Sequence, residues 1–183
     1  MPNWCENELK VSGDKKELSR FKKFAKEGKE ILSANKFIPY PKEFKDGDDK
    51  RAMIEKKQDA YQKSLISKGM TLEEARNKTW KKYPYIKDGF NSGGYGWCIA
   101  NWGTKWDFCR AELEDSKEDL FYHFDTAWSP PMPVIKAMGE MFTNLKFALR
   151  YFEGGMGFNG LFQMENGRVI SNLSGDYYGN RGG

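Results

Sequence analysis

Alternation of apolar and polar residues is the clearest pattern in this chain of 183 residues. Successive side chains of a strand point to opposite faces of a sheet, so a period of two predicts strands. The four longest segments that show it are residues 3–11, 109–114, 120–125 and 145–151. Two shorter ones, 161–165 and 168–173, are joined by Asn166-Gly167, a dipeptide that favours a two-residue turn. The pattern therefore predicts four strands followed by a C-terminal hairpin.

Apolar residues three or four positions apart predict two helices between those strands. Their apolar stripes are Leu18, Phe21 and Phe24 in the first helix, and Ile135, Met138 and Phe142 in the second. We expect Asp14 to cap the first helix, over residues 15–27, because a short side-chain oxygen can accept from the free backbone N–H groups of the first turn. Ser129 is expected to cap the second helix, whose early positions are prolines.

The order strand-helix-strand-strand-helix-strand is that of the split βαβ unit in the ferredoxin-like fold, an α+β fold with a four-stranded antiparallel sheet. This order emerges once residues 29–96 are set aside. We therefore predict a ferredoxin-like domain over residues 1–28 and 97–183, extended by the C-terminal hairpin. Residues 29–96 are predicted to form a mostly helical insertion.

Two helices are predicted within the insertion. Residues 50–67 place apolar side chains on one face, and residues 42–50 before them are interpreted as a charged loop. Thr71 and Glu74 have the spacing of a capping box, in which each side chain accepts from the backbone N–H of the other residue. This box opens a second helix that ends near Lys82.

Residues suited to metal or nucleophilic chemistry are scarce. The only histidine is His123, and the three cysteines include no CxxC pair. A zinc site would need ligands that the chain can hardly assemble, so no cofactor is expected and catalysis is disfavoured. The unpaired cysteines are typical of a reducing cytoplasm. No signal-peptide pattern and no run of about 20 apolar residues is present, so we expect no membrane contact.

Gly155 to Gly160 matches the GxGxxG pattern of dinucleotide-binding sites. Such a site needs a helix directly afterwards, because the helix N-terminus meets the pyrophosphate. The sequence continues here as a hairpin, so we interpret the segment as a glycine-rich turn.

Three of the six tryptophans, Trp97, Trp102 and Trp106, lie within ten residues in a segment predicted to be a loop. Loops are usually small and polar, so this spacing needs an explanation. One interpretation is an aromatic plug that docks the insertion against the sheet. The other is a binding surface, since tryptophan is enriched at the energetic centres of protein interfaces.

A polar group accompanies these tryptophans. Its members, together with the exposed-looking tryptophans, are the candidate binding residues Asn101, Trp102, Lys105, Trp106, Asp107, Asp125 and Trp128. Asp107 begins the second predicted strand and Asp125 ends the third, so a hairpin would bring the two carboxylates together. With Lys105 they would suit a small-molecule or nucleotide site. A buried, paired network that holds the loops in place explains the same residues.

The formal net charge of +4 is unevenly distributed. Residues 14–30 hold seven basic and four acidic side chains, residues 42–82 hold twelve and eight, and residues 107–119 hold two and six. Basic helices would suit a nucleic-acid-binding module, whereas mixed charges on solvated helix faces give the same counts. The lysine-glycine-aromatic motif of RNA-binding sheets is missing.

Three segments resemble the YubB-like family, ferredoxin-like proteins carried by phages and conjugative plasmids. They are residues 1–9, the string from Trp97 to Asp107 that contains Asn-Trp-Gly-Thr-Lys-Trp-Asp, and residues 125–131. Residues 151–155 are similar as well. The resemblance implies a ferredoxin-like fold and a mobile-element protein that engages a component of its bacterial host.

We therefore predict a non-enzymatic phage or plasmid accessory protein that binds a host protein in the bacterial cytoplasm, with antagonism of a defence system as one such role. The alternatives are a nucleic-acid-binding module that uses the basic helices, and a small-molecule or nucleotide site around Lys105, Asp107, Asp125 and Trp128. The sequence carries no signal for a particular oligomeric state.

Overall fold

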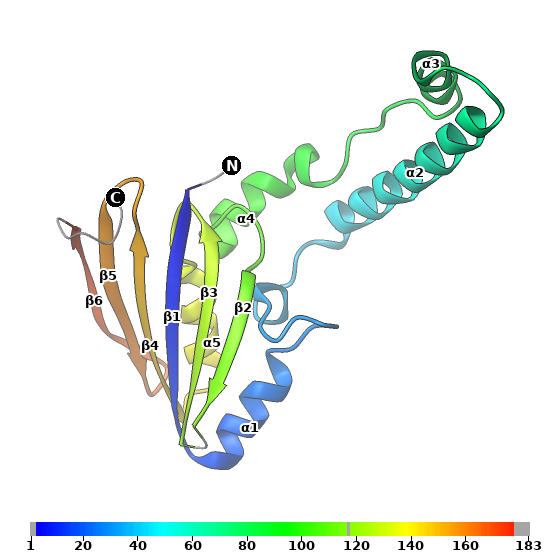
Figure 1. Cartoon of the computed structure of the whole chain (residues 1–183). Coiled ribbons are helices and arrows are strands. Elements are labelled where there is room, and N and C mark those ends of the chain that lie inside the picture. Colours follow the sequence, from blue (N-terminus) through cyan, green and yellow to red (C-terminus); the bar gives the residue numbers. More distant parts are fainter. Residues whose placement is uncertain (1–2, 117, 178–183) are drawn as a thin grey trace. The chain divides into compact units, whose positions relative to one another are not determined.

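Six antiparallel strands form one sheet in the computed structural model, which describes residues 3–116 and 118–177 (Figure 1). Their order across the sheet is β2-β3-β1-β4-β5-β6. The strands are β1 (Trp4–Gly13), β2 (Cys109–Asp115), β3 (Asp119–Ala127), β4 (Leu145–Glu153), β5 (Phe158–Glu165) and β6 (Arg168–Asp176). Strands β1 to β4 follow the predicted order. The hairpin β5–β6 turns at Asn166 and Gly167, as expected, and extends the sheet beyond β4.

One face of the sheet packs against two helices, α1 (Lys15–Phe24) and α5 (Met132–Met141) (Figure 1). The side chains that the central strands bury there are Leu9 and Val11, Tyr122 and Phe124, and Phe147 and Leu149. Phe21 of α1 is fully buried and meets Tyr122 and Phe147 edge-on, with ring centroids 6.0 and 5.5 Å away. Among the described residues of 1–39 and 96–183, no helix covers the opposite face of the sheet.

The chain divides into two compact units, one of Met1–Pro39 with Gly96–Gly183 and the other of Tyr40–Tyr95. The sequence pattern assigned residues 29–39 to the insertion, whereas the structure packs them with the sheet. Leu32, Ala34 and Phe37 are buried, and the ring of Phe37 stacks on Phe21 at 5.7 Å. These apolar residues follow α1 and complete the core beneath it, through the short turn η1 (Ala34–Lys36).

The unit of Tyr40–Tyr95 contains α2 (Lys42–Ser67), α3 (Leu72–Lys82) and a π-turn, η2 (Phe90–Gly94). The predicted loop 42–50 is helical, so α2 begins earlier than expected. Tertiary contact explains this: Asp48 accepts a 2.8 Å hydrogen bond from the backbone of Phe90, and Gly47 lies so close to Gly89 that a side chain would collide. The capping box of Thr71 and Glu74 is formed as predicted. None of the helices of the described residues is long and apolar enough to cross a membrane.

Two local predictions around the tryptophan cluster were wrong. The first part of the cluster is a helix, α4 (Tyr95–Trp102), and not a loop. Ser129 does not cap α5: the residue at the cap is Pro131, and the Ser129 hydroxyl donates to the carbonyl of Gly103 at 2.6 Å. Both differences arise because these residues make long-range contacts that local patterns do not encode.

Candidate functional site

Lys105, Trp106 and Trp128 come together at one end of the sheet. The Lys105 ammonium lies 4.7 Å from the ring centroid of Trp106 and 5.0 Å from that of Trp128. A cation above an aromatic face is attracted by the negative charge of the π-system. The sequence placed all three among its candidates, and the structure brings them together.

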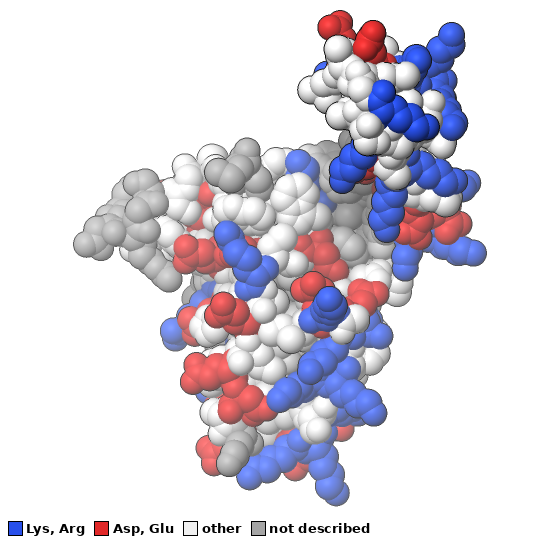
Figure 2. Space-filling view, turned by 45° about the vertical axis from the view of Figure 1, so that its right-hand side comes forward, with Lys and Arg blue, Asp and Glu red and all other residues white. Residues whose placement is uncertain are grey.

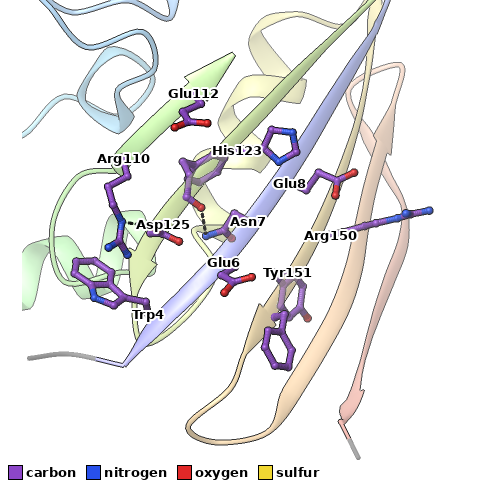
Figure 3. A pocket seen from close by; sticks show the side chains of 12 residues that line it. Trp4, Glu6, Asn7, Glu8, Arg110, Glu112, His123, Asp125, Arg150 and Tyr151 are labelled. Carbon is purple, nitrogen blue, oxygen red and sulfur yellow. Dashed lines mark hydrogen bonds and ion pairs between the residues drawn. The ribbon is translucent and has the colours of Figure 1, made fainter. Parts of the chain in front are cut away.

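The same group continues onto the open face of the sheet through two residues that the sequence did not single out. The ring of Trp4 lies 6.2 Å from that of Trp106. The Arg110 guanidinium lies 4.7 Å from the Trp4 centroid, and Figure 3 shows these two side chains next to each other. Arg110 also donates to the Asp125 carboxylate at 2.5 Å. We call Trp4, Lys105, Trp106, Arg110 and Trp128 the aromatic–cation array.

Backbone strain is concentrated in this array. Among the described residues, three that are not glycine have a φ in the left-handed region: Arg110 at 52°, Trp128 at 71° and Asn166 at 53°. Asn166 is in the hairpin turn, where this conformation is ordinary. Arg110 falls where the register of β2 and β3 shifts, and Trp128 immediately follows β3. Strained residues persist only where the surroundings hold them, and they gather at functional sites.

A partly buried network of hydrogen bonds holds the two segments that carry Lys105, Trp106 and Trp128. The Thr104 side chain pairs with the backbone of Ala127, accepting from its N–H at 3.0 Å and donating to its carbonyl at 3.1 Å. Thr126 donates to the carbonyl of Ser129 at 2.7 Å. The backbone N–H of Trp128 donates to the backbone carbonyl of Asn3 at 2.9 Å. These hydrogen bonds therefore fix the backbone on either side of Trp128, whose ring is exposed.

Beside the array, the open face of the sheet forms a hollow of about 680 Å³ (Figure 3). A row of side chains crosses it from strand to strand: Glu112 opposite His123, His123 opposite Glu8, and Glu8 opposite Arg150. The charged side chains that line it are Glu6, Glu8, Glu112 and Asp125 against Arg110 and Arg150. Because four acidic groups face two basic ones, the hollow has a formal charge of −2 with His123 neutral.

Trp102 and Asn101 do not belong to this surface. Trp102 is only 5% exposed, and its indole N–H donates to the carbonyl of Ile38 at 2.8 Å. The Asn101 amide donates to the carbonyl of Trp97 within α4 at 2.9 Å. Trp102 therefore fits the plug interpretation, whereas Trp106 is half-buried and contacts Lys105 and Trp4 in the array.

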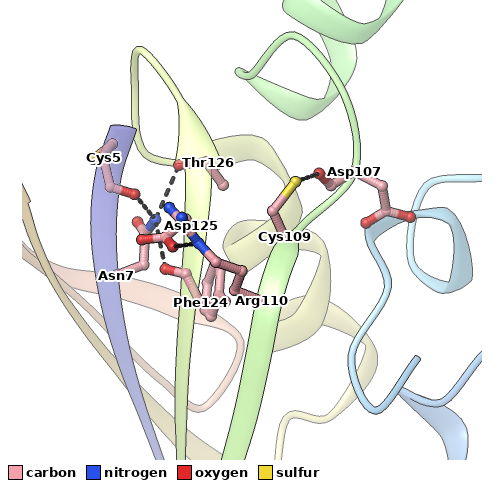
Figure 4. Close-up of polar contacts among 8 residues, drawn as sticks. All are labelled: Cys5, Asn7, Asp107, Cys109, Arg110, Phe124, Asp125 and Thr126. Atoms are coloured by element: carbon pink, nitrogen blue, oxygen red, sulfur yellow. Dashed lines mark hydrogen bonds and ion pairs between the residues drawn. The ribbon is translucent and has the colours of Figure 1, made fainter. Parts of the chain in front are cut away.

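Asp107 and Asp125 do not form the paired site that the sequence suggested. Asp107 accepts from the Ser33 hydroxyl at 2.7 Å and from the backbone N–H groups of Ala34 and Phe108 at 2.6 and 2.7 Å. Figure 4 shows its carboxylate turned toward this segment and away from Asp125. Asp107 lies two residues before β2, where the strand has not yet paired with β3. Asp107 therefore has a structural role, and the small-molecule site built on both carboxylates is not formed.

Thiol chemistry is not favoured by the surroundings of the cysteines near the array. Burial raises the pKa of the Cys5 thiol to about 12, and burial also raises the pKa of the Cys109 thiol. A thiol must lose its proton to act as a nucleophile, so both are poorly reactive at neutral pH. Among residues 3–116 and 118–177, no three His, Cys, Asp or Glu side chains are grouped as metal ligands.

Trp4 and Arg110 were missed for different reasons. Trp4 is part of the first predicted strand, and the pairing of Trp4 with Ala127 in β3 is what brings it beside the loop of Trp128. A register estimate for the first and third strands would have found it. Arg110 reaches Trp4 only because of the irregularity between Cys109 and Glu112, which leaves no signal in the sequence.

Part of the chain is similar to a known family of ferredoxin-like domains. Residues 101–180 match the family model described as the ferredoxin-like domain in Api92-like protein. The Api92-like match includes Lys105, Trp106, Arg110 and Trp128, and Trp4 lies outside it. It confirms the α+β ferredoxin-like fold that the sequence predicted.

A solved structure shows the same fold along the whole chain. The crystal structure of a protein Api92 from Yersinia pseudotuberculosis is 12% identical in sequence, with a TM-score of 0.54. The alignment covers 98% of this chain and 99% of that one. No curated protein matches the sequence. The Api92-like comparisons concern the fold, and neither links the chain to YubB-like proteins, phages or plasmids.

Proposed function

We propose that this chain is a protein-binding module that docks a partner on the aromatic–cation array and the adjacent hollow. The observation that carries the proposal is that Arg110 and Trp128 both have left-handed backbone conformations, with hydrogen bonds of Thr104 and Thr126 fixing the backbone on either side of Trp128 and an ion pair with Asp125 holding Arg110. Folding tolerates such strain where the position of the side chain is useful.

The composition of the array supports a protein partner. Trp and Arg dominate the few residues that contribute most to interface affinity, because they combine a large apolar surface with a polar end. Rigid positioning lowers the entropy lost on binding, so less of the contact energy is spent on ordering the surface. Trp128 keeps 39% of its surface exposed, and Arg110 is also exposed.

The charge of the hollow specifies the chemistry of the partner. Glu8 and Glu112 flank His123 and make no ion pair within the described residues. An excess of carboxylates repels phosphates and attracts lysine and arginine. The partner we propose presents a basic segment to the hollow while the array holds an apolar part of it. The YubB-like resemblance supports a host-cell protein as this partner, and interference with a host defence as one consequence.

A capture experiment with matched tryptophan variants tests this proposal. The full chain is used to isolate partners from nuclease-treated bacterial lysate, and the affinity of a captured protein is then measured with purified components. Trp106→Ala should weaken binding by about 30-fold or more, as expected for a hot-spot tryptophan. Trp80→Ala, at an exposed tryptophan of α3, should leave binding unchanged.

The charge requirement is tested on the same captured protein. Glu8→Lys combined with Glu112→Lys should weaken binding, whereas Glu140→Lys on α5, which covers the other face of the sheet, should not. A partner that binds folded Trp106→Ala as well as it binds the original protein would overturn the proposed surface. Unchanged binding by the Glu8→Lys, Glu112→Lys double variant would contradict the proposal that the partner presents a basic segment to the hollow.

The helical unit offers a second candidate function, binding to nucleic acid. Residues 40–95 hold 13 basic and nine acidic side chains, leaving 17 of each in the rest of the chain, so the entire formal charge of +4 lies in this unit. Figure 2 shows Lys and Arg side chains over much of its visible surface. Exposed Trp80 has Arg76 5.9 Å from its ring, a combination suited to stacking on bases.

If this unit binds nucleic acid, affinity for a labelled single strand should fall steeply with salt, because each phosphate that a lysine or arginine neutralises releases counterions. Lys56→Glu combined with Lys63→Glu should lower the slope of log affinity against log salt by about one for each phosphate that the variant no longer neutralises. Lys136→Glu on α5 is the matched control in the other unit. Weak binding whose affinity does not change with salt would exclude this function.

A further inference from the structure

The two edges of the sheet differ in how well they are protected against pairing with another strand. An edge strand exposes backbone donors and acceptors, and charged side chains and bulges normally block its pairing with other chains. Edge strand β2 has this protection: four of its seven residues are charged, and its register is irregular between Cys109 and Glu112.

The opposite edge, β6, lacks such protection over most of its length. Its only charged residues are Arg168 and Asp176, which are the first and last of nine. Between them, Val169, Ile170 and Leu173 are exposed. β6 is the last strand in the sheet, so one of its sides pairs with no strand among the described residues. A long strand of this kind is a template for strand addition.

We propose that β6 pairs antiparallel with β6 of a second copy of this chain, with Leu173 on the two-fold axis. The pairing of β6 with β5 is regular from Ser171 to Asp176, and the shift near Met164 lies outside this stretch. Pairing about Leu173 places Ser171 opposite Gly175 and Asn172 opposite Ser174. Small and uncharged residues thus surround one central leucine, and no like charges meet within the regular stretch.

A row of leucines makes this register favourable. Leu173 is directly opposite Leu161 of β5. Two copies joined at Leu173 would align Leu161, Leu173 and the same two residues of the second copy across the joined sheets. Opposed apolar side chains on neighbouring strands are what stabilises a sheet beyond its backbone hydrogen bonds.

Charge and symmetry favour a second copy as the occupant. The sheet-containing part of the chain, outside residues 40–95, has 17 basic and 17 acidic side chains, so two such units do not repel each other by net charge. An interface in which one strand meets itself is isologous, and it closes as a two-fold dimer without leaving a further edge of the same kind. The outcome is one continuous sheet made from two copies.

Sedimentation equilibrium of the purified full chain tests the dimer. The original protein should show a concentration-dependent dimer, and Leu173→Lys should raise its dissociation constant by roughly ten-fold or more, because two lysines would meet on the axis. Leu72→Lys is the matched control: Leu72 on α3 is 65% exposed and Leu173 is 63% exposed. A protein that remains monomeric throughout the micromolar range would overturn the proposal.

Disulfide formation tests the register independently of affinity. In a background with Cys109→Ser, the Leu173→Cys variant should form a disulfide with its own copy under mild oxidation, because directly opposed residues of an antiparallel pair bring their Cβ atoms within about 4.5–5.5 Å. Asn172→Cys and Ile170→Cys should form much less. Cross-linking that is strongest at either of these control positions would show that Leu173 is not on the axis and would refute the proposal.

Discussion

Trp128→Gly should abolish partner binding and yet leave a protein that is more stable than Trp128→Ala. Trp128 has a φ of 71°, a conformation that a Cβ atom disfavours and that glycine adopts freely. Alanine retains the Cβ and therefore the strain. The glycine variant should have a free energy of unfolding about 1 kcal/mol higher than the alanine variant. Both variants lack the indole and so fail to bind the partner.

The comparison with the original protein separates binding from folding. Removing the indole eliminates its interaction with Lys105, worth about 0.5–1 kcal/mol at an exposed site. Relief of strain in the glycine variant offsets a loss of that size. Because more than half of the Trp128 surface is buried, the glycine variant also loses apolar contacts, and we expect it to be less stable than the original protein but more stable than Trp128→Ala. A loss of binding by the folded glycine variant cannot then be attributed to unfolding.

Urea denaturation of the three proteins, together with the affinity for the captured partner, provides the measurement. The slope of free energy against urea concentration should be the same in all three, because the surface exposed on unfolding is unchanged. A glycine variant that is less stable than the alanine variant would show that the left-handed conformation is not maintained in solution. Undiminished binding by both would remove Trp128 from the docking surface.

The sequence could predict those features in which local residue preferences and burial favour the same structure. Strands β1, β3 and β4 alternate because one face is buried, so Leu9, Tyr122 and Leu149 reveal the sheet directly. The hairpin at Asn166 and the capping box at Thr71 depend on residues close in sequence. Local chemistry and burial agree at these positions, and the ferredoxin-like order follows from them.

The candidate site could be predicted only in part, because contacts between residues far apart in the sequence decide which of its residues are buried and which reach the surface. Trp102 and Trp106 are four residues apart and equally apolar, but the carbonyl of Ile38 holds the first in the interior by accepting its indole N–H. Asp107 was expected beside Asp125, but its carboxylate accepts a hydrogen bond from Ser33 and is oriented toward that residue. Arg110 enters the site through an irregularity in β2. A residue's neighbours in the sequence carry no information about such partners.

Asp107→Ala should lower the free energy of unfolding by about 2 kcal/mol or more. The Asp107 carboxylate accepts from the backbone N–H groups of Ala34 and Phe108, and alanine would leave these two donors without their acceptor, whereas the Ser33 hydroxyl can still donate to Glu27 at 2.7 Å. Each buried donor left without a partner costs about 1–3 kcal/mol. Ala34 is completely buried, so water cannot easily replace the carboxylate at its N–H. The folded fraction of the variant should still bind the partner, since Asp107 does not reach the array.

The pH dependence of this loss of stability reports the direction in which burial shifts the pKa of Asp107. Burial raises its pKa above the ordinary value of 3.8, and its hydrogen bonds from Ser33 and Ala34 oppose that shift only in part. A carboxyl whose pKa is higher when folded holds its proton more strongly in the folded state. Its contribution to stability is therefore fully present below pH 3.8 and decreases as pH rises through the raised pKa.

The stability difference between the original protein and Asp107→Ala should accordingly be largest in acid and shrink as pH rises, becoming constant above the raised pKa. Taking the difference cancels the titration of groups common to both proteins. Denaturation measured at several values from acid to neutral pH gives this curve. A difference that grows with pH would mean that the three donors stabilise the ionised carboxylate by more than burial destabilises it. Asp107 would then act as an anionic anchor for the segment of Ser33 and Ala34, and its pKa would lie below the ordinary value.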